Sequence, residues 1–137
     1  MFEEAAIRYK GSVQLAVVDH ISSPSATLFP VKKIANRLRP LGVLVLVDGA
    51  HAPGQVESID LANMNVDFYT GNLHKWAYAC KGTAFMWINP LHQGYIHPLN
   101  TSHTYKMPFP DEFYSRGTND SATKYIAAAN ALEFYDR

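Results

Sequence analysis

The sequence predicts an α/β fold of three layers, in which helices flank a mostly parallel sheet. Short β-branched apolar runs recur along the chain, and polar residues follow them directly. An amphipathic helical pattern separates the first two runs. The chain has 137 residues, 47% of them hydrophobic, which suffices for one domain-sized core. No internal domain boundary is evident, so we expect residues 1–137 to belong to one unit.

The first strand and the first helix are predicted before residue 42. Residues 14–18 form an apolar run typical of a buried strand, and a polar loop containing Ser23 and Ser25 follows it. Pro30 then opens a segment whose apolar residues repeat at helical spacing, and Pro40 closes it. This pattern predicts a short amphipathic helix.

The next strands are predicted from shorter apolar runs. Residues 43–47 form an unbroken apolar strand that ends at Asp48. The order strand, helix, strand implies that this strand pairs in parallel with the first one. Residues 59–65 are expected to form one or two helical turns, and further strands are predicted at 66–70 and 82–88.

The last third of the chain has a different composition. Residues 89–119 are rich in Pro, Gly, His, Tyr and Asn and lack periodicity, which predicts a long ordered excursion. Asp120 or Ser121 can cap a final helix. Its predicted apolar face contains Tyr125, Ile126, Ala129, Leu132 and Phe134. Because this face meets no following partner, we expect the chain to be part of something longer.

Composition argues against several classes of protein. Acidic and basic residues balance at 12 each, which gives no surplus of charge for nucleic acid or an anionic membrane. The single cysteine, Cys80, excludes an internal disulfide framework and a multi-cysteine zinc site, and we expect it to be a small buried residue. The apolar runs are too short to span a bilayer, and the start lacks a signal-peptide core. We expect a cytoplasmic protein without a metal site.

Polar residues gather where the predicted strands end. Ligands of open α/β sheets bind at the carboxyl ends of the strands. The residues expected there are Ser23, Asp48, His51, Asn72, His74 and Lys75. An aspartate and a lysine together suit pyridoxal 5′-phosphate (PLP), because its aldehyde takes an amine and its pyridine nitrogen needs an anion. The residues alone leave two alternatives open: Asp48 could equally be a helix cap and Lys75 a solvated surface charge.

The motifs around these residues resemble a known family. LVDGAHAPGQ contains Asp48, DFYTGNLHKW contains Lys75, and KGTAFMWI supplies the strand afterwards. With VDHISSPSATLFPVKKI before them and FYSRGTND after them, they resemble the class-V aminotransferases of PLP fold type I, especially the isopenicillin N epimerase-like branch. The resemblance covers nearly the whole chain. It implies that residues 1–137 form the central and C-terminal part of a PLP-binding large catalytic domain, without the flanking phosphate-loop region and small domain.

The resemblance also implies a role for each candidate residue. Lys75 would be the catalytic residue that forms the Schiff base, and Asp48 would hold the pyridine nitrogen. His51 matches the position that contacts the phenolic oxygen of the ring, and Ser23 and Ser25 lie in the loop that approaches the same side.

Three further cofactor-binding residues follow from the resemblance. Asn72 and His74 match positions that touch the cofactor phosphate. Thr118 resembles a threonine that reaches the phosphate of the neighbouring subunit, which implies a homodimer. Trp76 and Trp87 match no such role and are expected in the core or an interface, while His92, His97 and His103 are expected to make ordinary loop hydrogen bonds.

The function implied is that of a PLP-dependent enzyme acting on an amino-acid substrate, with Lys75 as acid and base at the α-carbon. Epimerisation, transamination, β-elimination and carbon–sulfur lysis share this core, and the fold does not select one. Two alternatives stay open: a cysteine desulfurase or carbon–sulfur lyase, and a truncated non-catalytic protein that retains dimerisation surfaces. We expect the 137-residue chain alone to be inactive.

Overall fold

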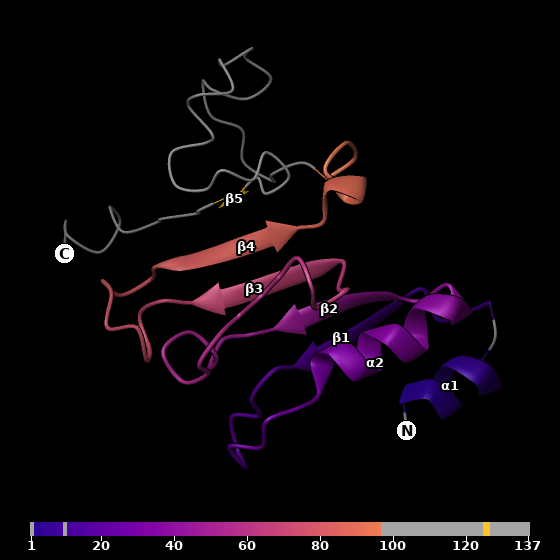
Figure 1. The fold of residues 1–137 in the computed structure, drawn as a ribbon, viewed down its shortest axis with the longest axis horizontal. Helices are drawn as coiled ribbons and strands as arrows, with labels where there is room; N and C mark the ends of the chain where they lie inside the picture. The colour runs from indigo at the N-terminus through magenta and orange to yellow at the C-terminus, as the bar shows by residue number, and fades with distance from the viewer. Residues whose placement is uncertain (1, 10, 97–124, 127–137) are drawn as a thin grey trace.

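The protein forms one five-stranded sheet in a computed structural model that describes residues 2–9, 11–96 and 125–126 (Figure 1). The strands follow one another in the order of the sequence: β1 (Leu15–Asp19), β2 (Leu44–Asp48), β3 (Phe68–Asn72), β4 (Ala84–Ile88) and β5 (Tyr125–Ile126). The first three pair in parallel, and β4 is antiparallel to both of its neighbours. Only β4 therefore runs against the others, which confirms the predicted α/β class with a mostly parallel sheet.

The connection between β1 and β2 is the predicted amphipathic helix. It forms α2 (Val31–Leu38), which continues into the 3-10 turn η1 (Arg39–Leu41). Gly42 ends this turn with φ of 72°, a left-handed conformation that glycine adopts without steric cost. The buried face of α2 packs on β2, and burial of a leucine such as Leu38 contributes about 2 kcal/mol.

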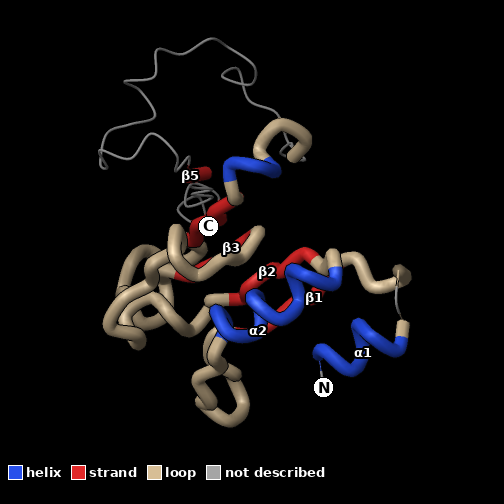
Figure 2. Tube along the Cα trace, turned by 45° about the vertical axis from the view of Figure 1, so that its right-hand side comes forward, coloured by secondary structure: helices blue, strands red, loops and turns tan. Residues whose placement is uncertain are grey.

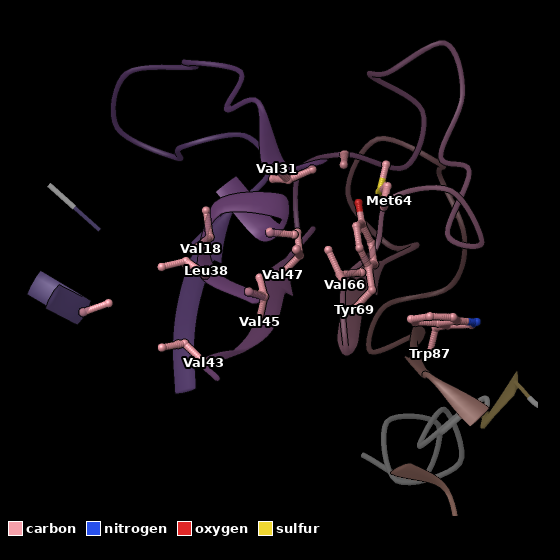
Figure 3. Packing of buried hydrophobic residues seen from close by; sticks show 13 residues of the cluster. Val18, Val31, Leu38, Val43, Val45, Val47, Met64, Val66, Tyr69 and Trp87 are labelled. Carbon is pink, nitrogen blue, oxygen red and sulfur yellow. The ribbon is translucent and has the colours of Figure 1, made fainter. Parts of the chain in front are cut away.

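Helices cover one face of the sheet. Figure 2 shows α1 (Phe2–Arg8) and α2 on the same side, where Arg37 of α2 donates to Glu3 of α1 at 2.9 Å. Val45 and Val47 of β2 face α2 and are fully buried, as Figure 3 shows. On the opposite face Val17 is 57% exposed. Within the described ranges, two of the three predicted layers are therefore present.

The element boundaries lie close to the predicted ones, and two short elements are additional. The strands begin within two residues of their predicted starts. Residues 59–65 form a single hydrogen-bonded turn, in which Met64 N donates to Asp60 O at 3.0 Å. The helix α1 was not predicted. The 3-10 turn η2 (Pro90–His92) begins the predicted excursion, with Asn89 as its side-chain cap.

The predicted C-terminal helix is wrong at two residues. Tyr125 and Ile126 form β5, paired with Trp87 and Met86 of β4. The edge of β4 offers unpaired backbone groups, and pairing with them satisfies the main chain as a helix would. Residues 127–137 of that helix lie outside the described residues, as do Thr118, His97 and His103.

A buried aspartate closes the amino ends of β2 and β3. Asp67, 4% exposed, accepts from Val45 N at 2.8 Å with Oδ2, and its Oδ1 lies 2.7 Å from His92 Nε2. Arg39 approaches the same oxygen at 3.5 Å. We call Asp67, His92 and Arg39 the Asp67 cluster. The loop hydrogen bond predicted for His92 is confirmed.

None of the described helices is long and apolar enough to cross a membrane.

Candidate functional site

The carboxyl ends of β1, β2 and β3 meet at one edge of the sheet, as their parallel register requires. Asp48 is the last residue of β2, and its side chain is exposed. Its Oδ1 accepts from Ala50 N at 2.9 Å, which bends the chain away from the strand. Asn72, half-buried, ends β3 on the same face of the sheet as Asp48. The edge thus carries a solvent-accessible carboxylate.

A buried polar pair lies beneath this edge. His20 Nδ1 and the Tyr69 hydroxyl are 2.8 Å apart, and both residues are buried. Gly49 passes directly over the phenol: a Cβ at that position would lie 2.3 Å from the Tyr69 hydroxyl oxygen. Only glycine fits there, so the residue after Asp48 can approach Tyr69 closely.

Burial sets the charge state of this pair. It raises the pKa of the Tyr69 phenol far above its ordinary value, and the negative charge of Asp48 raises it further. Desolvation lowers the pKa of His20 below its ordinary 6.5. Both groups are therefore neutral at pH 7, and the carboxylate of Asp48 lies above an uncharged layer.

The loop after Asp48 brings His51 to Lys75. His51 Nε2 and Lys75 Nζ are 3.2 Å apart, and both residues are half-buried. Trp76 Nε1 donates to the other ring nitrogen, His51 Nδ1, at 3.2 Å. The loop can pack this closely because Gly54 has φ of 85°, and a Cβ there would lie 2.5 Å from the Trp76 carbonyl oxygen.

A cavity of about 330 Å³ opens beside these residues. Ser23, His51 and Trp76 line it together, so the loop after β1 and the loop after β2 share one pocket. Ser25 does not line this cavity, and its hydroxyl instead lies 2.8 Å from that of Thr27. Of the two candidate serines, Ser23 is therefore the one that lies beside His51 in this cavity.

His74 faces a different partner. Its Nδ1 lies 3.1 Å from the backbone oxygen of Thr83 and must donate to it, because a carbonyl only accepts. Nε2 is then the ring nitrogen left to meet a ligand. Thr118 lies outside the described residues. The described residues contain no group of three histidine, cysteine or acidic side chains that could hold a metal ion.

The structure thus groups some predicted residues and separates others. His51 contacts Lys75 and shares a cavity with Ser23, but within the described ranges no hydrogen bond or ion pair joins Asp48 to Lys75. An amine, an imidazole and a carboxylate therefore lie at the same edge of the sheet. Such a set can bind an aldehyde covalently and hold a cationic ring nitrogen.

Sequence reasoning missed or misplaced several residues of this region. His20 and Tyr69 were not identified, and their pairing across 49 residues leaves no local signal. Trp76 was expected in the core or an interface, but it is 43% exposed and binds His51. Its position next to Lys75 was the available signal. Cys80, expected to be buried, is exposed, because it lies in the turn that leads to β4.

The chain is similar in sequence to known proteins. The family model for aminotransferase class-V matches residues 3–134. A putative L-cysteine desulfhydrase 1 of Oryza sativa subsp. japonica is 36% identical over 129 residues, which cover 91% of this chain and 26% of that protein. The isopenicillin N epimerase of Streptomyces clavuligerus is 33% identical over 95 residues, covering 69% and 24%. The chain thus spans about a quarter of the curated relatives that it matches.

Solved structures share the fold. The apo cysteine desulfurase of Thermococcus onnurineus NA1 superposes with a TM-score of 0.65 at 20% identity, over 74% of this chain and 25% of that one. A structure of SspA in complex with cysteine also gives 0.65, at 18% identity, over 77% and 30%.

Proposed function

Because the chain belongs to the class-V aminotransferase family, which implies PLP as cofactor, we propose that it carries the cofactor-anchoring part of an enzyme acting on an amino acid through Lys75. On this proposal, residues 1–137 are the central and C-terminal part of a PLP-binding large domain. The observation that carries the proposal is the 3.2 Å contact between Lys75 Nζ and His51 Nε2, on the edge of the sheet where Asp48 is exposed.

The side chains at this edge fit PLP chemically. Lys75 offers an amine for the aldehyde, and Asp48 offers an exposed anion for the pyridine nitrogen. His51 offers a ring nitrogen toward the phenolic oxygen, which lies next to the aldehyde on the ring. Gly49 lets the chain after Asp48 lie against Tyr69, because a Cβ there would come within 2.3 Å of the Tyr69 hydroxyl oxygen. The protonated ring, when bound, supplies an electron sink for the substrate α-carbon.

Lys75 is the proposed catalytic residue. Its amine would hold the cofactor through the aldehyde carbon, with the aldehyde oxygen and both amine hydrogens leaving as water. Once a substrate amine had taken its place, Lys75 would act as a base near the α-carbon and move the α-proton. Asn72 and, through Nε2, His74 are proposed to bind the cofactor phosphate, and Thr118 to do so across a homodimer.

Reductive trapping tests the role of Lys75. The protein is incubated with PLP, reduced with borohydride and digested, and the modified peptide is identified by mass spectrometry. The adduct is expected on Lys75 and lost in Lys75→Ala. Lys81→Ala is the matched control, because Lys81 is an exposed lysine six residues away, and it should keep the adduct. An adduct on Lys81 or Lys106 in the unmodified sequence would refute the assignment.

A second candidate function is more specific: carbon–sulfur lysis of cysteine. Its support is that several L-cysteine desulfhydrases are 33–36% identical over about nine-tenths of this chain. Epimerisation of an isopenicillin-type amino acid has the support of two epimerases, at 33–34% over 69–75% of the chain.

One pair of assays separates these reactions. The assays use the enzyme of which this chain is proposed to be a part, because the 137-residue chain alone is expected to be inactive. Sulfide release is measured with L-cysteine, and inversion at the α-carbon is followed by chiral chromatography with a panel of amino acids. Sulfide release without inversion supports the lyase, and the reverse supports the epimerase. Absence of both reactions, together with absence of a Lys75 adduct, would support the non-catalytic alternative.

A further inference from the structure

We propose that Trp76 is a positioning residue that acts through His51: its indole N–H fixes which nitrogen of the imidazole carries the hydrogen, and so aims a donor at the amine of Lys75. The inference rests on the proposed function of Lys75. It goes beyond that proposal because it adds a residue that neither the motif nor its chemistry identified.

Two hydrogen bonds determine the tautomer. The indole nitrogen is only a donor, so His51 Nδ1, 3.2 Å from it, must be an acceptor and carries no hydrogen. Neutral imidazole then has its hydrogen on Nε2, which lies 3.2 Å from Lys75 Nζ. This N–H is satisfied when Lys75 presents its lone pair. The other tautomer and the imidazolium would each point an N–H of His51 at the N–H of Trp76.

The hydrogen on Nε2 of His51 can serve the site both before and after the cofactor binds. A donor at Nε2 of His51 holds the amine nitrogen of Lys75, 3.2 Å away, in one position at the edge where an aldehyde would be attacked. The same N–H also suits the phenolic oxygen of PLP, which is an acceptor. One tautomer of His51 therefore serves Lys75 before the cofactor binds and the ring afterwards.

The placement of Trp76 is consistent with this role and not with core packing. Its side chain is 43% exposed, whereas Trp87 is 4% exposed and its Nε1 has no partner within the described residues (Figure 3). The close approach at Gly54 holds the backbone of Trp76 against the loop that carries His51. The two tryptophans thus differ in use: Trp87 contributes its ring, and Trp76 its N–H.

The test compares Trp76→Phe, which keeps a ring but removes the donor, with Trp87→Phe as matched control. The first readout is the ¹⁵N NMR signature of His51 in the histidine-labelled, cofactor-free protein, assigned with His51→Gln. The unmodified protein and the control should show hydrogen on Nε2, and Trp76→Phe a mixture of tautomers. The second readout is the rate of PLP addition to Lys75, trapped with borohydride, which should fall about two- to tenfold in Trp76→Phe.

The outcomes separate the two proposals. An unchanged His51 signature and an unchanged rate in Trp76→Phe would overturn the role of Trp76. An adduct on another lysine in the unmodified protein would refute the proposed function, while the NMR readout still decides the tautomer. If Trp76→Phe does not fold, 3-benzothienylalanine at position 76 keeps the shape of the indole and replaces its N–H by sulfur. That variant must then show the mixed tautomers, and a pure Nε2–H signature would contradict the proposal.

Discussion

The two ends of the central strands both carry an aspartate and a histidine, but in different surroundings. At the amino end, Asp67 is buried and bound by Val45 N and His92, with Arg39 close by. At the carboxyl end, Asp48 is exposed and accepts from Ala50 N. The same residue type holds two strands together in one place and faces solvent in the other.

This difference distinguishes, within one sheet, the polar groups that stabilise the fold from the polar groups that can bind a ligand. A buried carboxylate that is fully bound contributes to stability, and its loss leaves donors without partners. An exposed carboxylate at the ligand-binding edge contributes little to folding and remains available for a ligand. Substitutions at the two ends should therefore change different measurements.

The largest effect on stability is expected for Asp67→Ala. The substitution leaves the buried N–H of Val45 and the side chain of His92 without their acceptor, so the free energy of unfolding should fall by about 3 kcal/mol. Urea unfolding followed by circular dichroism measures it. Asp48→Ala is the matched control and should stay within about 0.5 kcal/mol. Equal losses at both positions would remove the distinction between the two ends.

The next effect concerns the reaction and not folding. Asp48→Asn removes the negative charge but keeps the side-chain shape, so the proposed partner of the pyridine nitrogen is lost. In the enzyme of which this chain is proposed to be a part, exchange of the substrate α-hydrogen with deuterated solvent should slow by about a hundredfold or more, as for other lost electrostatic contacts. Proton NMR follows the exchange. Exchange at the unmodified rate would mean that Asp48 does not hold the ring.

A smaller effect is expected beneath the functional edge. Tyr69→Phe leaves His20 Nδ1 buried without its partner, and the free energy of unfolding should fall by about 1–2 kcal/mol. Tyr78→Phe is the control, because Tyr78 is 87% exposed. If both variants unfold at the same urea concentration as the unmodified protein, the His20–Tyr69 pair does not stabilise the edge.

The smallest effect is a dependence of stability on pH. Desolvation lowers the pKa of His20 in the folded protein, so the unfolded chain binds a proton first as the pH falls below about 6.5. The stability that neutral His20 provides is complete above that pH and is lost as the pH falls towards the folded pKa, with a slope of at most about 1.4 kcal/mol per pH unit. Unfolding between pH 7.5 and 5 measures it. His20→Gln should flatten the slope, and an unchanged slope would exclude this source.

Much of the fold could be predicted because its signals are local. The run 43–47 and the segment opened by Pro30 carry their own period, so β2 and α2 lie within a residue or two of their predicted bounds. The place of Asp48 at the carboxyl end of β2 followed from the buried strand before it. By contrast, the strand at Tyr125–Ile126 depends on pairing with β4, a partner about forty residues away that no local period reveals.

The candidate site shows the same limit. Lys75, His51 and Ser23 were proposed from the motifs, but the contact between the first two was not predicted. The role of Trp76 depends on the direction of one N–H, and direction is a property of the folded loop and not of the residue type. Sequence reasoning therefore proposed several residues of this edge but not how they are joined.

The reversed direction of β4 bears on the order in which the protein folds. Because β4 runs back along β3, residues 73–83 form a hairpin connection, and Lys75 lies on it three residues after the end of β3 at Asn72. Asp48 joins β3 only through a parallel pairing that must close the loop from 49 to 67. Contacts between near neighbours in sequence form faster than distant ones. The lysine hairpin can therefore form first, and the arrival of β2 would complete the site, an order that pulsed hydrogen exchange can resolve.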